Sequence, residues 1–458
     1  MGQKGPHSRQ EEMAITRISV AGFKSISQEQ AIEIRPLTIL AGPNSSGKSS
    51  MMQPLLLLKQ TLEETYDPGA LLLYGPNVKF TAVDQFLART GKSEHAKTFS
   101  VGMRVGNAII NLSFHRQQDK RIGIQEVHFS SEGQEFSLRL GMTHEEILSA
   151  LPQDLKSDYE RVSEEATSKL EWIVIRKRCF LEPALEMEGR QVYFQFGNLR
   201  MPSATIEPYI RGLIHLPGLR GNPERAYPFT AAEAPFPGTF EKYLASVIAQ
   251  WQTEKDRDKL DQLSKDLEKL SLTWKVTAKP INDTQVELQV GRLTRATKGR
   301  ARDLVNIADV GLGVSQVLPV LVALHVAEPE QLVYLEHPEL HLHPRAQFAM
   351  AQILANAANR WVRVVVETHS SLLLLGIQAL VAEGKLAPEK VKLHWFKRDE
   401  SGNTKVTSAD LDEMGAFGDW PEDFADVALE AESRYLDAAG AWGRKNGYGG
   451  KKVETPRH

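Results

Sequence analysis

Short apolar runs of strand length open the chain and lead into a helical pattern. Between residues 15 and 41 the apolar positions fall in such runs, the last of which is Leu37-Thr38-Ile39-Leu40. A glycine-rich turn follows at once, and residues 51–65 then place leucines at helical spacing. We expect Pro54 in or near the first turn of this helix, where its missing N–H costs little. The pattern therefore predicts a strand, a glycine-rich loop and a helix in direct succession.

The middle of the chain changes its period twice. Residues 98–140 alternate apolar and polar positions, with breaks at Gly106-Asn107 and at residues 131–133, which predicts an antiparallel meander. Residues 143–176 and 239–271 are predicted to be helical. In the second stretch, leucines from Leu260 to Leu270 recur at spacings of three and four. A strand pair is expected at residues 274–276 and 286–290.

From residue 303 the pattern becomes α/β again. We predict a helix over 317–326, a buried strand over 332–335, a helix over 345–358 and another buried strand over 362–366. The two ends of the chain would then share one α/β core, with an antiparallel β subdomain and a helical insertion between them.

Composition narrows the class without naming a partner. The 458 residues are 41% hydrophobic and 25% charged, and the formal net charge is −3, as in an ordinary globular protein. Cys179 is the single cysteine, which rules out an internal disulfide and fits a reducing cytoplasm. No apolar run approaches the length of about 20 residues that a membrane helix needs. We expect a cytoplasmic protein with a disordered leader at 1–12 and a disordered basic tail at 436–458.

The glycine-rich turn is a complete phosphate-binding loop. Its sequence, Gly42-Pro43-Asn44-Ser45-Ser46-Gly47-Lys48-Ser49, matches G-x-x-x-x-G-K-S and stands between the predicted strand and helix. The glycines allow backbone N–H groups to face phosphate oxygens at the positive end of a helix. Lys48 would reach the β- and γ-phosphates of ATP, and the Ser49 hydroxyl would hold Mg²⁺.

Three further segments bring chemistry to expected strand or helix ends. The strand over 332–335 ends in Glu336, a ligand for a magnesium-bound water or else a solvated carboxylate. The second strand delivers His369 to the same edge, although a histidine there is more often structural. Gly311, Gly313, Ser315 and Gln316 precede the predicted helix, so they form either a second anion site facing a partner subunit's nucleotide or a simple cap.

Two other clusters have weaker readings. The basic run Arg292, Arg295, Lys298, Arg300 and Arg302 is the best local candidate for DNA contact, but a solvated loop explains it as well. His337, His341 and His343 do not have the spacing of a helical zinc site. The sequence does not single out a Q-loop glutamine, although Gln85 is available.

Taken together, these segments resemble a known group of ATPases. The run Glu336-His337-Pro338-Glu339-Leu340-His341-Leu342-His343-Pro344 is similar to the pattern E-x-P-E-L-H-L-H-P of stand-alone bacterial AAA-type ATPases. These belong with the ABC-type ATPase heads of the RecF/SMC/OLD group. Residues 22–26, 218–225 and 418–424 add to the resemblance, which covers about residues 13–435.

The resemblance implies a P-loop NTPase core of ABC-ATPase type, with a RecA-like sheet, the antiparallel β subdomain and a helical insertion. It also implies a head-to-tail homodimer, or a higher homo-oligomer, that encloses two ATPs. Its halves would be residues 13–142 and 273–435, on either side of an insertion at 143–272. Ser49 and Glu336 would hold Mg²⁺, and His369 would be the switch histidine. The expected nucleotide-binding residues are Lys24, Asn44, Ser45, Ser46, Gly47, Lys48, Ser49, Ser50, Gly311, Gly313, Ser315 and Gln316.

One position departs from the family pattern. The residue after the magnesium carboxylate is usually the glutamate that polarises the attacking water, and here it is His337. A neutral His337 could act as the base, Glu339 could replace it, or hydrolysis could be slow and partner-stimulated. We predict low basal ATPase activity. Arg220 and Arg225 lie in a family motif, where an interface role and a structural salt bridge are equally open.

The expected function is an ATP-hydrolysing switch or sensor that controls a separate effector, a nuclease or toxin, in anti-phage defence. The alternative is a RecF-like DNA-binding ATPase of repair or maintenance. A built-in nuclease is disfavoured because few residues remain after His369. A transporter ATPase is disfavoured because the signature is not L-S-G-G-Q.

Overall fold

The computed structural model describes residues 14–89, 94–119, 121–166, 168–192, 200–230, 233–295 and 303–418, together with residue 434. The expected leader and tail, and Lys298, Arg300 and Arg302 of the basic run, lie outside these residues. Within the described part, no helix combines the length and the apolar character needed to cross a membrane.

The central sheet joins the two ends of the chain. Its strand order is β11-β16-β17-β3-β18-β19, in which only β19 is antiparallel to its neighbour. β3 comes from the N-terminal part and lies between β17 and β18, so the predicted sharing of one α/β core is confirmed. The bounds are β3 Leu37–Ala41, β11 Ile214–Leu216, β16 Leu332–Glu336, β17 Arg363–Glu367, β18 Val391–Arg398 and β19 Thr404–Ala409.

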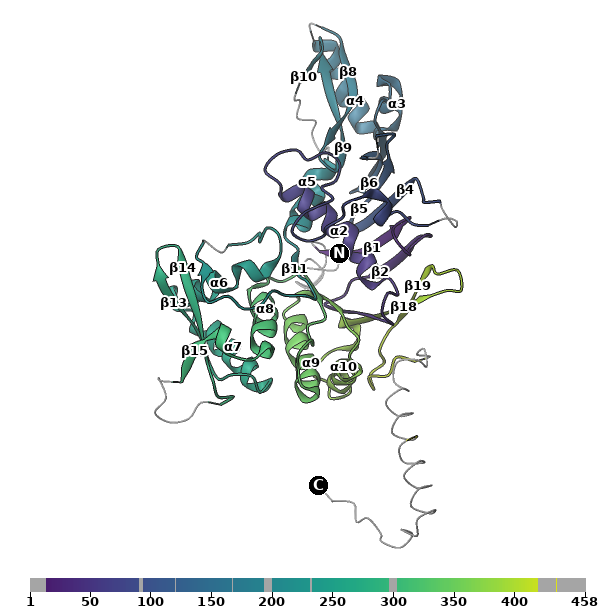
Figure 1. Ribbon diagram of the computed structural model, residues 1–458. Coiled ribbons are helices and arrows are strands. Elements are labelled where there is room, and N and C mark those ends of the chain that lie inside the picture. Colours follow the sequence, from purple (N-terminus) through teal and green to yellow (C-terminus); the bar gives the residue numbers. More distant parts are fainter. Residues whose placement is uncertain are drawn as a thin grey trace, which may run out of the picture.

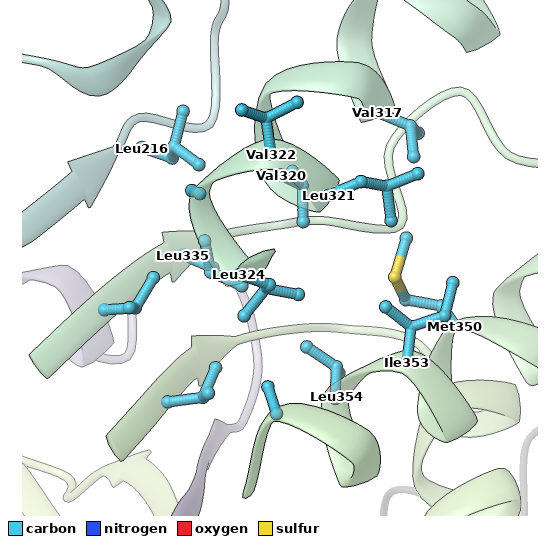
Figure 2. Close-up of a cluster of buried hydrophobic side chains, with 14 of the residues drawn as sticks. Leu216, Val317, Val320, Leu321, Val322, Leu324, Leu335, Met350, Ile353 and Leu354 are labelled. Carbon is cyan, nitrogen blue, oxygen red and sulfur yellow. The ribbon is translucent and has the colours of Figure 1, made fainter. Parts of the chain in front are cut away.

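Helices cover both faces of this sheet, which explains why β3, β16 and β17 are apolar without alternation. Val333 and Leu335 of β16 pack with α8 (Leu312–Val326), α9 (Pro344–Asn359) and α10 (Ser371–Ala382). Leu332 and Tyr334 of the same strand face α2 (Lys48–Glu63) instead. Figure 2 shows the first of these cores, where leucines and valines of α8 meet Met350, Ile353 and Leu354 of α9.

A second, antiparallel sheet has the order β2-β1-β4-β5-β6-β7 and contains the predicted meander. Its buried residues belong to the same cluster as the apolar side of α2, so it positions the helix that follows the phosphate loop. The bounds are β1 Ile15–Ala21, β2 Gln30–Glu33, β4 Thr98–Val105, β5 Ala108–Arg116, β6 Ile122–Ser131 and β7 Gln134–Arg139.

The insertion is less helical than predicted. After α3 (His144–Ala150) and α4 (Gln153–Glu165) comes a three-stranded sheet, β8 (Leu170–Lys177), β9 (Phe180–Met187) and β10 (Arg190–Val192), at the top of Figure 1. The expected helix to residue 176 is therefore wrong from residue 170. The β-branched run Ile173-Val174-Ile175 favours a strand, and antiparallel pairing with β9 decides in its favour. α5 (Pro202–Arg211) follows.

The second predicted helical stretch is divided in two. α6 (Leu244–Thr253) and α7 (Arg257–Lys269) are separated by a break at Asp256, whose side chain accepts a hydrogen bond from Lys259 N at the start of α7. Leu263 and Leu267 are buried, in agreement with their helical spacing. These helices adjoin a small sheet of β12 (Tyr227–Pro228), β13 (Val276–Asn282), β14 (Gln285–Gly291) and β15 (Leu304–Asn306), at the left of Figure 1.

Two helix starts differ from the prediction. α2 begins at Lys48, so Pro54 lies in its second turn rather than its first. α8 begins at Leu312 with Gly311 as its N-cap, so Gly313, Ser315 and Gln316 lie inside the helix instead of before it. Val314 and Gln316 are buried, and this packing extends the helix through a stretch whose glycines favour a turn.

Candidate nucleotide-binding site

The phosphate loop connects the tip of β3 to α2. Two of its positions have backbone conformations and close contacts that only glycine can accommodate. Gly42 and Gly47 have φ values of 140° and 106°, and Ser45 also has a positive φ, of 61°. A Cβ atom on Gly42 would lie 2.2 Å from Phe396 O, and one on Gly47 would lie 2.3 Å from Thr404 Oγ1. Gly47 caps α2 without a side-chain hydrogen bond, so the first N–H groups of the helix face the loop.

Lys48 folds back onto the loop. Its Nζ donates hydrogen bonds to Gly42 O at 3.0 Å and Pro43 O at 2.9 Å. Burial lowers the pKa of Lys48, while the charges of Glu367 and Glu339 oppose that shift. The amine is thus held at the loop by weak backbone acceptors that phosphate oxygens would outcompete.

The other expected loop residues divide by exposure. Asn44 and Ser45 are exposed, whereas Ser46 and Ser50 are buried. Lys24 lies against an aromatic ring. Its Nζ is 4.9 Å from the ring centre of Phe80, and burial lowers its pKa.

Support for the loop comes from the β18–β19 hairpin, which sequence analysis missed. Thr404 Oγ1 lies 2.7 Å from both Ser46 O and Ser25 Oγ. Arg398 Nε donates a hydrogen bond to Ser45 O at 2.6 Å. The hairpin therefore holds the loop through its backbone carbonyls at residues 45 and 46.

Two carboxylates meet at the strand tips beside this loop. Glu336 and Glu367 are register partners in β16 and β17, and Glu367 also pairs with Leu40 of β3. One oxygen of Glu336 lies 3.2 Å from His215 Nε2, and the other accepts a hydrogen bond from Gly218 N at 3.0 Å. Burial favours the neutral form of Glu336, but His215 and Gly218 outweigh it and lower its pKa.

Glu367 is the carboxylate that touches the loop. It accepts a hydrogen bond from Ser49 Oγ at 2.9 Å through Oε1 and another from Tyr334 OH at 2.9 Å through Oε2. Burial and the nearby charge of Glu336 raise the pKa of Glu367. Sequence analysis missed this residue, although it ends a buried strand just as Glu336 does.

His337 stands between two acids. Its Nδ1 lies 3.8 Å from Glu339 Oε1 and its Nε2 lies 3.7 Å from Glu367 Oε1. Burial opposes protonation, but the proximity of Glu339 and the charges of both acids outweigh it, so the pKa of His337 is raised. The ring stacks on that of His369 at 4.9 Å between centres.

His369 has the opposite character. Burial, followed by the charges of Lys48 and His337, lowers the pKa of His369 to about 4. At neutral pH the stacked pair therefore consists of a neutral His369 and a His337 with an increased tendency to hold a proton.

Glu339 fixes the turn that carries His369. Its Oε1 accepts hydrogen bonds from Thr368 Oγ1 at 2.5 Å and His369 N at 3.2 Å. Burial raises its pKa, but the nearby His337 and the hydrogen bond from Thr368 outweigh burial, and the net shift is downward. Its side chain is therefore an ionised anchor of the segment after β17.

A histidine that sequence analysis overlooked orients Glu336. His215 of β11 is buried, stacks on Tyr334 at 5.4 Å between ring centres, and has its Nδ1 3.0 Å from Asn77 Oδ1. Its position between two apolar strand residues was the available signal. A buried polar side chain within a strand needs a hydrogen-bond partner.

Arg220 connects the strand tip to the start of α8. Its two terminal nitrogens donate to Glu336 O at 2.9 Å and Gln316 O at 3.1 Å, and Gln316 Nε2 donates to Gly221 O at 3.1 Å. Arg225, by contrast, forms an exposed ion pair with Asp309 at 2.6 Å.

The start of α8 is held by local contacts. Ser315 Oγ donates to Leu312 O at 3.1 Å. These contacts lie within one chain, so the facing of Gly311, Gly313, Ser315 and Gln316 to a partner's nucleotide stays a prediction.

The residues at the loop fit Mg²⁺ and a nucleotide. Ser46 Oγ and Glu339 Oε2 are buried with no hydrogen-bond partner among the described residues. Glu367 accepts the hydrogen bond of the Ser49 hydroxyl, and Glu336 is its register partner on the next strand. In the described part of the chain, no group of His, Cys, Asp and Glu could hold a metal on its own. An ion bound here would therefore need phosphate oxygens as further ligands, as Mg²⁺ commonly does.

The remaining candidates lie away from this chemistry. His341 and His343 are exposed, and His343 caps α9. Gln85 accepts hydrogen bonds from the backbone of residues 81 and 82, which is a local capping role. Of the basic run, Arg292 forms an ion pair with Asp303 at 3.1 Å and Arg295 is exposed.

Solved structures with a related arrangement are heads of SMC proteins. An SmcHead bound to the C-winged helix domain of ScpA shares 12% identity, with a TM-score of 0.49, over 87% of this chain and 98% of that one. The SMC head domain from Thermotoga maritima shares 9%, with a TM-score of 0.36, over 86% and 98%. A head with an extended coiled coil, bound to the C-terminal domain of ScpA and derived from Pyrococcus furiosus, shares 11%, with a TM-score of 0.45, over 93% and 99%. These likenesses are too distant to carry an argument about function.

Sequence comparison identifies the family. No curated protein matches the chain. Residues 37–375 match the family described as "AAA domain, putative AbiEii toxin, Type IV TA system". This range contains the phosphate loop, both strand-tip carboxylates and His369. Because the match spans well over half of the chain, the protein belongs to this AAA-domain family.

Proposed function

We propose that this ATPase binds Mg²⁺-ATP between two copies of the chain and that nucleotide-dependent closure switches a separate effector. The observation that carries the proposal is that, within one chain, a side of the site with a lysine and free N–H groups faces a side with carboxylates. Lys48 and the uncapped start of α2 face Glu367 and Glu339, whose charges act on Lys48. Cations and N–H groups on one side and carboxylates on the other suit a bound phosphate-metal pair.

Binding rests on groups that the loop already presents. Lys48 would exchange the carbonyls of Gly42 and Pro43 for phosphate oxygens, and the first N–H groups of α2 would bind the same phosphates. When bound, Mg²⁺ would neutralise part of the phosphate charge. Ser49, together with the Glu367 carboxylate that accepts its hydrogen bond, would hold it.

Hydrolysis by the isolated chain is expected to be slow. An effective base has to accept a proton from water, and the raised pKa of His337 opposes that role. Glu339 is anchored by Thr368 and the backbone of His369. A partner that reorders this turn would therefore speed hydrolysis. Neutral His369 is suited to contact the γ-phosphate.

The link to a partner would run through α8. Arg220 bonds both to the backbone of Glu336 and to that of Gln316, so a shift at the strand tip reaches the exposed start of α8. In a head-to-tail dimer this start faces the other subunit's nucleotide. The family's description refers to toxins and antitoxins. In line with the toxin named there, the proposed role is cytoplasmic defence, with a nuclease or toxin as the separate effector.

Lys48→Ala tests the proposal directly. We expect this variant to lose binding of a fluorescent ATP analogue, because the phosphate charge is no longer met at the loop. Lys385→Ala removes an exposed lysine elsewhere and should bind like the wild type. Retention of ATP binding in Lys48→Ala would overturn the proposed function.

A further inference from the structure

The strand-tip carboxylate that the sequence pattern assigns to Mg²⁺ is held by other groups. Both oxygens of Glu336 have partners on the β11 side, with His215 Nε2 at 3.2 Å and Gly218 N at 3.0 Å. Its backbone carbonyl is bound by Arg220 at 2.9 Å. Glu336 therefore ties β16 to β11 and to the segment around Gly218.

The neighbouring strand supplies a carboxylate directed at the phosphate loop. Glu367 lies in register between Leu40 of β3 and Glu336 of β16, and its Oε1 accepts the hydrogen bond from Ser49 Oγ at 2.9 Å. Its Oε2 accepts a hydrogen bond from Tyr334 OH at 2.9 Å, and only 4% of the residue is exposed. Two anchored oxygens in a buried site leave this carboxylate little freedom.

A purely structural role would be to satisfy the buried hydroxyl of Tyr334. That role uses Oε2 alone and leaves the contact with Ser49 unexplained. A serine hydroxyl that coordinates a cation through its oxygen must give its proton to a neighbouring acceptor, and Glu367 Oε1 is in position to accept it. Carboxylates that orient metal ligands in this way tune the affinity for the metal.

We propose that Glu367 is the positioning residue that orients Ser49 for the magnesium of the bound nucleotide, whereas Glu336 is chiefly a structural anchor of the strand tip. This inference rests on the proposed function, since it concerns the same nucleotide site. The sequence pattern assigns the magnesium role to Glu336, and this inference assigns it to the pair of Ser49 and Glu367.

The test compares Glu367→Gln with Glu336→Gln, and exposed Glu383→Gln serves as the matched control. Glutamine preserves the shape and can still accept one hydrogen bond, but it lacks the charge. Binding of a fluorescent ATP analogue is measured in EDTA and across a Mg²⁺ titration. Mn²⁺ binding in the presence of ATP is followed by electron paramagnetic resonance.

We expect Glu367→Gln to bind nucleotide in EDTA at least as tightly as the wild type, because a negative charge beside the phosphates is removed, while its Mg²⁺ and Mn²⁺ midpoints rise about 10-fold or more. Glu336→Gln should shift these midpoints less. A shift in Glu336→Gln that equals or exceeds that of Glu367→Gln would overturn the inference. A wild-type chain that binds no nucleotide under any condition would instead overturn the proposed function.

Glu367→Asp provides a second test in case Glu367→Gln does not fold. It retains the charge on a shorter side chain, so we expect metal midpoints between those of the wild type and Glu367→Gln. Melting temperatures identify any variant that is not folded, and in that case Glu367→Asp carries the comparison with Glu336→Asp. Equal midpoints for the two aspartate variants would contradict the assignment.

Discussion

At the scale of single residues, His337 is the residue that we expect to limit the rate of ATP hydrolysis. Its pKa is raised by the acids on either side, so it is poorly suited to take a proton from water. We predict that His337→Glu increases single-turnover ATP hydrolysis by about 10-fold or more, because a carboxylate would then stand at the base position. Release of inorganic phosphate under excess enzyme measures this rate.

The same assay separates His337 from Glu339. His341→Glu changes an exposed residue of the same turn and should leave the rate unchanged. If His337→Glu hydrolyses no faster and His337→Ala is inactive, His337 itself is the base. If Glu339→Gln alone abolishes hydrolysis while ATP still binds, Glu339 is the base.

At the scale of elements, the β18–β19 hairpin determines the shape of the phosphate loop. Thr404→Val keeps the volume of the side chain but removes the oxygen that contacts Ser46 O and Ser25 Oγ. We predict a loss of about 1–2 kcal/mol in the free energy of unfolding, together with weaker ATP binding. Chemical denaturation and nucleotide titration measure the two effects. Thr407→Val, an exposed change in the same strand, should alter neither.

The same hairpin contains a pH-dependent element. His394 is buried in β18, 2.8 Å from Ser408 Oγ and 2.9 Å from Glu33 O, and burial lowers its pKa to about 4. The unfolded chain binds a proton at His394 near pH 6.5, whereas the folded chain does not until about pH 4. The contribution of His394 is therefore complete above pH 6.5 and is lost as the pH falls from 6.5 towards 4.

We predict that His394→Gln reduces this loss of stability in acid. The shift corresponds to an upper limit of about 3 kcal/mol between pH 7 and pH 4. Urea unfolding at a series of pH values measures the difference between variant and wild type. An unchanged slope of stability against pH between 4 and 6.5 would contradict a neutral, buried His394.

At the scale of the whole molecule, the exposed start of α8 is the surface expected to meet a second subunit. Leu312 is 45% exposed, and a Cβ atom on neighbouring Gly311 would meet no other atom within 4 Å. We predict that Leu312→Asp prevents ATP-dependent dimerisation and leaves nucleotide affinity at the loop nearly unchanged. The substitution buries a charge only when two copies associate.

Light scattering coupled to gel filtration, with and without Mg²⁺-ATP, measures the association. Leu140→Asp places the same charge on an exposed residue after β7 and should dimerise like the wild type. Equal dimerisation of Leu312→Asp and the wild type would exclude the start of α8 from the interface.

The sequence by itself determined the features that depend on local pattern. Residues 42–49 form the loop between strand and helix, and β16, β17 and the meander lie where periodicity predicted them. These features follow from spacing along the chain, because backbone geometry gives helices and strands their own periods. The strand over 170–177 escaped prediction because its pairing with β9, and not its period, decided its conformation.

Only the tertiary structure decided which side chains meet. The hairpin that carries Thr404 and Arg398 lies far along the chain from the loop that it supports. Glu336 and Glu367 both end buried strands, and the sequence cannot distinguish them. Parallel register places them side by side, and His215 then holds one while Ser49 contacts the other. Partners across a sheet depend on strand order and register, which arise only when distant segments pack together.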